Sequence, residues 1–255
     1  MIFSNKTIIR YKHGISTKIE DPVICEDWFN LFLNNKLIYQ TPVLDQEIDD
    51  LIYGLLYIKG HIKVRTNGRS PLLDIIKKGR DWFISSKEAL PGQSFRQMVE
   101  EAQQKVGSLK IDSGISISPR YKADKILDLM MDFQKLPSVY HNTGGVHMAA
   151  FAADKILFWA DDVSRRNSVD KVIGKILKSD INFEDGIIVS SGRISSDIVI
   201  RMIKTGIKII ASVSAPMDKA IDLANTYGIT LCGFVRAGRM NIYTHPERVI
   251  IDYKE

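Results

Sequence analysis

The residues between His141 and His147 combine groups that bind or orient a ligand. In this segment, two imidazoles flank a pair of glycines. Glycine lets a backbone approach a ligand closely, and an imidazole changes its charge near neutral pH. The candidate cofactor-binding residues here are Thr143, Gly144, Gly145 and His147. The alternative is a histidine that is hydrogen-bonded within the core. A metal site is not expected, because the chain has only five histidines and lacks further ligands at suitable spacing.

Three other segments place hydroxyl groups, glycine or arginine directly after predicted strands. They are residues 161–167, 190–196 and 212–216. Each runs towards a predicted helix, where free backbone N–H groups bind anions and arginine adds two parallel donors. The candidate binding residues in these turns are Arg165, Ser191, Gly192, Arg193 and Ser214. The alternative for each serine is a helix N-cap. Three such turns at one edge of a sheet favour a phosphate site.

Residues 232–244 predict a strand, a tight glycine turn and a returning strand. Two arginines stand beside that turn, and guanidinium groups suit a guanine or a pyrophosphate. The candidate cofactor-binding residues are Phe234, Val235, Arg236, Ala237, Gly238 and Arg239. The alternative is a solvated hairpin tip. Cys232, within the apolar strand, is expected to be a small buried hydrophobic residue.

The second half of the chain alternates predicted strands and helices. The predicted strands are residues 156–160, 187–189, 207–211 and 230–235, and the predicted helices are 168–177, 195–204 and 216–227. Apolar runs of strand length alternate with segments of helical periodicity. Such a series predicts a mostly parallel sheet covered by helices, with ligands outside the carboxyl ends of its strands.

The first half predicts a more mixed arrangement. Asn34 and Asn35 between two apolar runs predict a hairpin over residues 31–39, and residues 45–56 have helical periodicity. Helices are also expected around 72–78, around 95–105 and from Pro119 to about Gln134, with an exposed loop over 106–118. We therefore expect three regions: an N-terminal α+β subdomain (1–66), a connecting region with the exposed loop (67–118) and an α/β cofactor-binding domain (119–255).

Bulk composition excludes several protein classes. The 255 residues are 45% hydrophobic and 25% charged, and no apolar stretch reaches the length of a membrane span. The first residues lack the features of a secretory signal, so a cytoplasmic protein that does not act at a membrane is expected. The net charge of +5 suits an anionic ligand. Lysines and arginines are spread along the chain rather than clustered among aromatic residues, so nucleic-acid binding is not expected.

Several of these segments together resemble a known family. Phe133-Gln134 followed by residues 142–147 is similar to the signature of the formate dehydrogenase accessory proteins. Further similar segments follow in the same order: residues 162–165 with Asn167, Asp170, Lys171, Ile173 and Gly174, then 191–193, 214–216 and 233–236 with Arg239, Asn241 and Tyr243. Residues 31–35, Thr41-Pro42, 54–56 and Gly60 resemble the family's opening, so the resemblance covers most of the chain.

This resemblance implies both a fold and a function. The fold would be a cytidine-deaminase-like three-layer α/β domain with a mixed, mostly parallel sheet, plus a smaller N-terminal α+β part, in a homodimer. The family binds the bis-molybdopterin guanine dinucleotide cofactor, for which GDP would be a mimic. It acts as a sulfurtransferase: it takes sulfur from a cysteine desulfurase as a cysteine persulfide and passes it to the cofactor before insertion into formate dehydrogenase.

The sequence departs from the family at the residues that would carry sulfur. Ser113 and Ser116 occupy the positions of the family's two loop cysteines, and a hydroxyl does not carry persulfide. The two cysteines of the chain, Cys25 and Cys232, lie elsewhere. The alternative function is therefore a chaperone that binds the cofactor or a guanine nucleotide without sulfur transfer. A hydrolytic deaminase is a third reading, but the chain lacks the zinc signature of that class.

Overall fold

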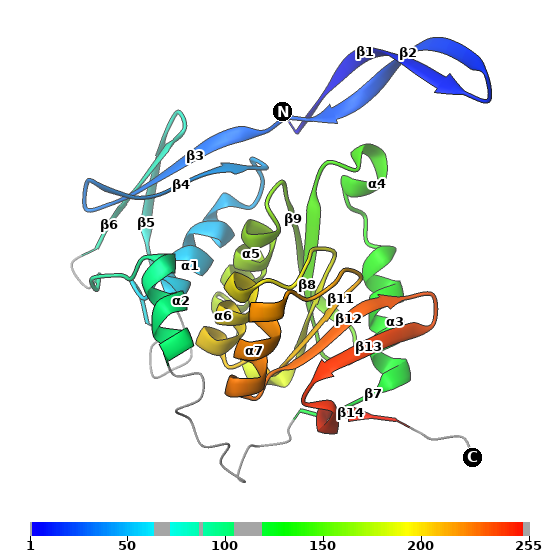
Figure 1. Ribbon diagram of the computed structural model, residues 1–255. Coiled ribbons are helices and arrows are strands. Elements are labelled where there is room, and N and C mark those ends of the chain that lie inside the picture. Colours follow the sequence, from blue (N-terminus) through cyan, green and yellow to red (C-terminus); the bar gives the residue numbers. More distant parts are fainter. Residues whose placement is uncertain (1, 64–71, 87–88, 105–118, 252–255) are drawn as a thin grey trace.

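A six-stranded mixed sheet forms the centre of the molecule (Figure 1). The computed structural model describes residues 2–63, 72–86, 89–104 and 119–251. The strand order is β13-β12-β11-β10-β8-β9. Their bounds are β8 (His147–Ala152), β9 (Ile156–Asp162), β10 (Ile187–Ser190), β11 (Ile209–Ser212), β12 (Thr230–Arg236) and β13 (Arg239–Thr244).

Where strands that are consecutive in the chain pair with each other, the length of the connection decides whether they are parallel. Helices α6 (Ser196–Thr205) and α7 (Asp218–Tyr227) connect β10, β11 and β12, which pair in parallel. Short turns join β8 to β9 and β12 to β13, and those pairs are antiparallel, as is β8 with β10. A short turn reverses the chain direction, whereas a parallel pair needs a long crossover. The expected mixed sheet is confirmed, but it has fewer parallel pairs than expected, and strand β8 was not predicted.

Helices cover both faces of the sheet and create three layers. Figure 1 shows α3 (Ala123–Gln134) on one side and α5 (Arg165–Leu177), α6 and α7 on the other. Alternate strand residues supply the two cores: Ile188 and Leu231 pack in the cluster on the α5 side, and Val189 and Cys232 pack in the cluster with α3. The three-layer α/β fold is thus confirmed, whereas the cytidine-deaminase-like label stays a prediction.

The remaining elements of this half are short. They are α4 (Tyr140–Thr143), the 3-10 helices η1 (Phe183–Asp185) and η2 (Pro246–Arg248), and the strands β7 (Tyr121–Lys122) and β14 (Val249–Ile250). Strands β7 and β14 pair in parallel, so α3 begins at Ala123 rather than at the predicted Pro119. Among the described helices, none has the length and apolar character needed to span a membrane.

The N-terminal half contributes a four-stranded sheet and two helices. The strands are β3 (Asp27–Leu33), β4 (Lys36–Val43), β5 (Asp74–Lys78) and β6 (Asp81–Ser85), in the order β4-β3-β6-β5. The helices are α1 (Ile48–Ile58) and α2 (Phe95–Gln104), both close to their predicted ranges. The helix expected over 72–78 is wrong. Residues 74–78 are strand β5 because Gly79 adopts a positive φ of 62° and turns the chain into β6, against which β5 pairs.

Helices α1 and α5 cross at very short range. A Cβ atom added to Gly54 of α1 would lie 1.9 Å from the carbonyl oxygen of Asp170. One added to Gly174 of α5 would lie 1.9 Å from the carbonyl oxygen of Asp50. Only glycine permits this separation, so α1 and the central domain share one continuous core. The division into regions at residues 66 and 118 stays a prediction.

The first two strands form a separate hairpin. Strands β1 (Phe3–Lys12) and β2 (Ile15–Ile24) form a two-stranded sheet, pair with no other strand among the described residues, and project from the body of the molecule (Figure 1). Ile9, Tyr11 and Ile15 are 67%, 73% and 66% exposed. The hairpin therefore leaves large apolar side chains outside the core.

Candidate functional site

The predicted turns converge at one edge of the central sheet. His147, the first residue of β8, pairs with Asp162, the last residue of β9, and Ser190 pairs with Ser212 at the ends of β10 and β11. Backbone hydrogen bonds join successive turns: the N–H of Val213 donates to the Ser190 carbonyl (3.2 Å), and the N–H of Phe234 donates to the Ser214 carbonyl (3.1 Å). The structure thus brings together the segments around residues 147, 165, 191, 214 and 234. Their role in cofactor binding stays a prediction.

A pocket of about 470 Å³ opens at this edge. It lies between the C-terminal end of α3, the loop around α4 and the turns that follow β9, β10 and β11. Its lining residues are Phe133, Gln134, Tyr140, His141, Gly144, Gly145, Val146, His147, Met148, Val163, Ser191 and Val213. Of the predicted binding residues, Gly144, Gly145, His147 and Ser191 line it. Tyr140, Val163 and Val213 were not singled out from the sequence, because nothing local distinguishes an aromatic or valine wall from core packing.

His147 is held as a neutral imidazole beside two cations. Burial lowers its pKa below the ordinary value, and the nearby Arg165 and Arg193 lower it further, against a smaller opposing effect of Asp162. A Cβ atom at Gly192 would lie 2.9 Å from Cβ of Arg165 and 3.5 Å from Nδ1 of His147. Gly192 therefore leaves the space in which these two side chains approach each other. A neutral imidazole next to guanidinium groups suits an anionic ligand with hydrogen-bonding oxygens.

The glycines of the 141–147 segment serve the loop itself. Gly144 ends α4 with a φ of 64°, and the Thr143 hydroxyl donates to the Val139 carbonyl (2.8 Å) and accepts from the Gly145 N–H (3.2 Å). A Cβ atom at Gly145 would lie 2.9 Å from Cγ1 of Ile24, at the end of β2. The close backbone approach at Gly145 is thus to the N-terminal hairpin. Gly145 also lines the pocket, so Ile24 lies directly behind this part of the pocket wall.

The serines of the turns form no helix-capping hydrogen bond through their side chains. Ser164 and Ser195 occupy the N-cap positions of α5 and α6 without a side-chain capping hydrogen bond, and Met217 occupies that of α7. The Ser191 hydroxyl instead accepts from the N–H of Met148 (2.9 Å). Arg165 donates to the Ser195 hydroxyl (3.3 Å), and its buried Nε has no hydrogen-bond partner among the described residues. Arg193 is exposed.

The β12–β13 hairpin carries the other predicted binding residues. Phe234 and Ala237 adopt left-handed φ values of 53° and 51°, and the pairing shifts register between Gly233 and Arg236. Arg236 lies over the ring of Phe234, 5.9 Å from its centroid. Val235 is fully buried, so the structure does not expose this predicted binding residue to a ligand.

A second pocket, of about 300 Å³, separates the tip of this hairpin from α3. Its lining residues are Asp124, Leu127, Asp128, Met130, Met131, Gln134, Arg236, Ala237 and Gly238. Gln134 also lines the first pocket, so the two adjoin at the end of α3. Arg239 is exposed and lines neither pocket. The two aspartates were missed because, in the sequence, they are ordinary polar positions of an amphipathic helix.

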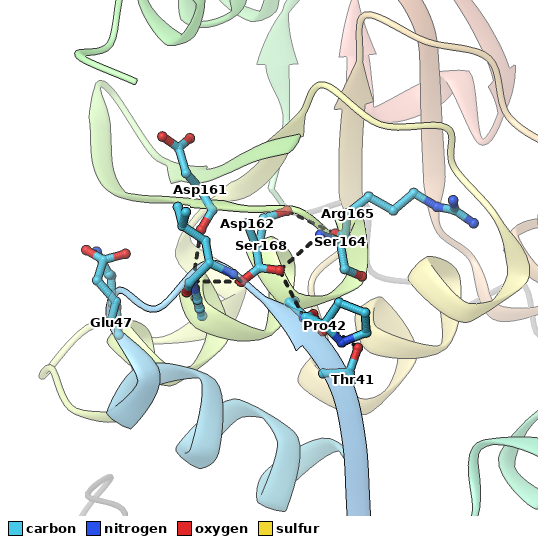
Figure 2. Close-up of polar contacts among 12 residues, drawn as sticks. Thr41, Pro42, Glu47, Asp161, Asp162, Ser164, Arg165 and Ser168 are labelled. Atoms are coloured by element: carbon cyan, nitrogen blue, oxygen red, sulfur yellow. Dashed lines mark hydrogen bonds and ion pairs between the residues drawn. The ribbon is translucent and has the colours of Figure 1, made fainter. Parts of the chain in front are cut away.

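A buried polar cluster fixes the end of β9 against the N-terminal half. Figure 2 shows Asp162 between the end of β4, at Thr41 and Pro42, and the start of α5. Oδ2 of Asp162 lies 2.7 Å from Nζ of Lys171, and both side chains are fully buried. Lys171 also donates to the carbonyls of Leu44 (3.1 Å) and Asp161 (3.0 Å). This cluster sets the position of the turn from which Arg165 extends (Figure 2).

The two cysteines differ in access. Cys232 is fully buried, and burial raises the pKa of its thiol to about 12. Cys25, just after β2, is half-buried. Ser113 and Ser116 lie outside the described residues. Within the described ranges, no group of three or more His, Cys, Asp or Glu side chains is arranged to hold a metal ion.

Comparisons with known proteins agree on one family. A family model described as the FdhD/NarQ family matches residues 24–250. The chain is 32% identical over 256 residues to a protein of Bacillus subtilis named "Sulfur carrier protein FdhD", covering 96% of each chain. It is 34% identical to a protein of the same name from Sulfolobus acidocaldarius, covering 95% of this chain and 96% of that one. A crystal structure described as a formate dehydrogenase accessory protein from Desulfotalea psychrophila matches with a TM-score of 0.76 over 98% of this chain and 100% of that one, at 21% identity. This last likeness supports the fold.

Proposed function

The chain belongs to the FdhD/NarQ family, and we propose that it binds the bis-molybdopterin guanine dinucleotide cofactor and acts in its sulfuration for formate dehydrogenase. In this role, it takes sulfur from a cysteine desulfurase in the cytoplasm. The names of its relatives support the sulfur-carrier role. The observation that carries the cofactor-binding role is the pocket at the sheet edge, which the 140–148 segment and the turns at Val163, Ser191 and Val213 line together.

The pocket suits a phosphate-bearing ligand. Arg165 and Arg193 place positive charge beside His147, whose lowered pKa leaves it uncharged and free to accept or donate a hydrogen bond. Ligands of α/β sheets bind outside the carboxyl ends of the strands, and the ends of β9, β10 and β11 all lie here. Arg165 and Arg193 of the turns supply this positive charge, and Ser191 lines the pocket beside His147.

Sulfur transfer through this chain would depend on Cys25. A thiolate attacks the outer sulfur of the desulfurase persulfide and becomes a persulfide, while the desulfurase cysteine leaves as a thiolate. Cys232 does not suit this step, because its thiol is buried and its raised pKa disfavours the thiolate. Cys25 is more accessible, and the neighbouring Ile24 packs against Gly145 in the pocket wall. Cys25 is thus the next residue in the chain after Ile24, which contacts the wall of the proposed cofactor pocket.

A second candidate function is a chaperone that holds the cofactor without moving sulfur. The serines at 113 and 116, together with the buried Cys232, are the observations that favour it. The names of the relatives favour the sulfur carrier instead. Both functions use the same pocket, so they differ only in whether a persulfide forms on this chain.

One experiment separates these functions. The wild-type protein is titrated with GDP in a calorimeter, and the same sample is incubated with a cysteine desulfurase and cysteine, then analysed by thiol-trapping mass spectrometry. The sulfur-carrier role predicts a gain of one sulfur atom on the peptide containing Cys25, absent from Cys25→Ser. Ser113→Cys/Ser116→Cys serves as a positive control for persulfide formation. GDP binding without a persulfide would select the chaperone role, and failure to bind GDP would contradict the shared cofactor site.

The N-terminal hairpin supports a homodimer. A two-stranded hairpin is marginally stable on its own, and unpaired strand edges are templates for another chain. A second copy of this chain would cover the exposed Ile9, Tyr11 and Ile15. Sedimentation velocity should show a dimer that Ile9→Lys/Tyr11→Lys dissociates, whereas Leu72→Lys, at a side chain 97% exposed outside the hairpin, should not. A monomeric wild-type protein would contradict the dimer.

A further inference from the structure

A third pocket, of about 560 Å³, lies at the C-terminal end of α1, and its volume is within the range of small-molecule sites. We propose that it binds a small 2-hydroxy carboxylate, with Lys59 holding the carboxylate and His61 holding the hydroxyl group. The β3–β4 turn, the end of α1 and the segment before α2 supply its lining residues, which are Leu33, Asn34, Lys36, Leu37, Ile38, Lys59, His61, Ala89, Leu90, Pro91, Gly92, Gln93 and Ser94. None of these residues lines either of the other two pockets, so the site is separate from the proposed cofactor site.

One nitrogen of the His61 ring is fixed by the protein, and the other is left for a ligand. His61 is only 9% exposed, and its Nδ1 lies 3.0 Å from the Leu90 carbonyl oxygen. A carbonyl oxygen can only accept, so Nδ1 carries a proton and Nε2 of the neutral ring is an acceptor. Nε2 has no hydrogen-bond partner within the described part of the chain. Buried polar groups normally have a partner, and a ligand hydroxyl in this pocket can supply the missing donor.

The surrounding backbone holds His61 in a fixed position. Gly60 ends α1 with a φ of 77°, and the N–H of His61 donates to the Leu56 carbonyl (2.8 Å). The N–H of Leu90 donates to the His61 carbonyl (3.0 Å). A Cβ atom at Gly92 would lie 2.2 Å from Cε1 of His61, so only glycine leaves room for the ring. The segment before α2 therefore fixes the imidazole as part of the pocket wall.

Lys59 supplies a positive charge that the protein does not pair. Its side chain forms no ion pair or hydrogen bond among the described residues, and its Nζ lies 5.1 Å from the centroid of the Tyr39 ring. Burial lowers the pKa of the Lys59 ammonium, and the nearby Arg201 lowers it further, against an opposing effect of Asp170. An anion beside Nζ would offset this cost of holding the charge away from water.

The remaining lining residues indicate the rest of the ligand. None of the described lining residues is acidic, and the exposed Lys36 adds positive charge. Leu37, Ile38 and Leu90 offer apolar contact, which suits a carbon chain rather than a free phosphate ion. An ammonium group forms a charge-assisted hydrogen bond with a carboxylate, and a hydroxyl on the adjacent carbon can donate to Nε2 of His61. A 2-hydroxy acid with a short apolar chain combines these three features.

Ligand titrations followed by NMR test the site on the full chain. The probes are 2-hydroxyhexanoate, hexanoate, 1,2-hexanediol and inorganic phosphate, and the signal is the ¹⁵N shift of Nε2 in histidine-labelled protein. We expect 2-hydroxyhexanoate to shift Nε2 of His61 and to bind about 10-fold or more tightly than hexanoate, which lacks the hydroxyl, and the diol, which lacks the charge. Equal binding of hexanoate would remove the role of His61, and tighter binding of phosphate would overturn the carboxylate ligand.

A matched pair of lysine substitutions tests the role of Lys59. Lys59→Met should weaken binding of 2-hydroxyhexanoate by about 10-fold or more, to the level of the diol. Lys63→Met removes an exposed lysine outside this pocket and should leave the affinity unchanged. Equal effects of the two substitutions, or an unchanged affinity in Lys59→Met, would overturn the site. GDP binding should be the same in Lys59→Met as in the wild type, so failure of this site and failure of the proposed function are separate results.

Discussion

Nζ of Lys171 lies 2.7 Å from Oδ2 of Asp162, and neither side chain reaches solvent. The pair joins α5 to the last residue of β9, and through the Leu44 carbonyl it also holds the segment that leads into α1. Asp162 further accepts from the N–H of Ser164 (3.0 Å) and from the side chain of Asn167 (2.9 Å). These contacts place the turn carrying Arg165, so a structural ion pair sets the geometry of the candidate site.

Removing the cation of this pair should strongly destabilise the protein. Lys171→Met leaves the Asp162 carboxylate buried without its counter-charge, and we expect the free energy of unfolding to fall by about 3–5 kcal/mol. Chemical denaturation measures this change. Lys135→Met removes an exposed pair with Asp132 (3.9 Å) and should cost about 0–1 kcal/mol. Equal effects of the two substitutions would contradict a structural role for the buried pair.

The α1–α5 crossing should not tolerate a methyl group. Gly174→Ala would place a Cβ atom 1.9 Å from the Asp50 carbonyl oxygen, so the helices must separate. We expect a loss of about 1–3 kcal/mol or more, measured by thermal or chemical unfolding. Gly79→Ala is the comparison, because its Cβ meets nothing within 4 Å and only its positive φ opposes the change. A smaller loss at Gly174 than at Gly79 would show that the crossing adapts easily.

His147 should titrate below the ordinary histidine range. Burial and the neighbouring arginines lower its pKa in the folded state, so the unfolded chain takes up the proton first as the pH falls. Its stabilising contribution is therefore complete above the unfolded pKa of about 6.5 and is lost as the pH drops through the folded value. NMR titration of the His147 ring gives the midpoint directly. His147→Gln should flatten this part of the stability curve, and a midpoint at or above 6.5 would contradict the lowered pKa.

The two arginines beside the hairpin turn should differ in nucleotide binding. Arg236 lines the second pocket, whereas the exposed Arg239 lines neither pocket. Arg236→Ala should therefore weaken GDP binding by about 1.5–3 kcal/mol, the contribution of a charge-assisted hydrogen bond. Arg239→Ala should have a clearly smaller effect. Calorimetry with GDP measures both, and a larger loss at Arg239 would place the nucleotide on the other side of the hairpin.

The local sequence pattern was sufficient to predict most strands and helices of the central domain. The strands at 156, 187, 209 and 230 and the helices between them follow from apolar runs and helical periodicity, and the edge at which their turns converge follows from that order. The wrong helix over 72–78 shows the limit of local pattern. Residues 74–78 become β5 only because β6 pairs with them, and pairing partners are not encoded within a short window.

The candidate site shows the same division. The sequence by itself determined which residues could bind an anion, from His147 to Arg236, and that the loop positions 113 and 116 hold serine. Only the tertiary structure decided that Thr143 and Gly145 serve the loop, and that Asp128 and Arg236 line one pocket. The physical reason is that burial, hydrogen-bond partners and cavities arise between elements far apart in the chain. Composition and periodicity describe each element alone.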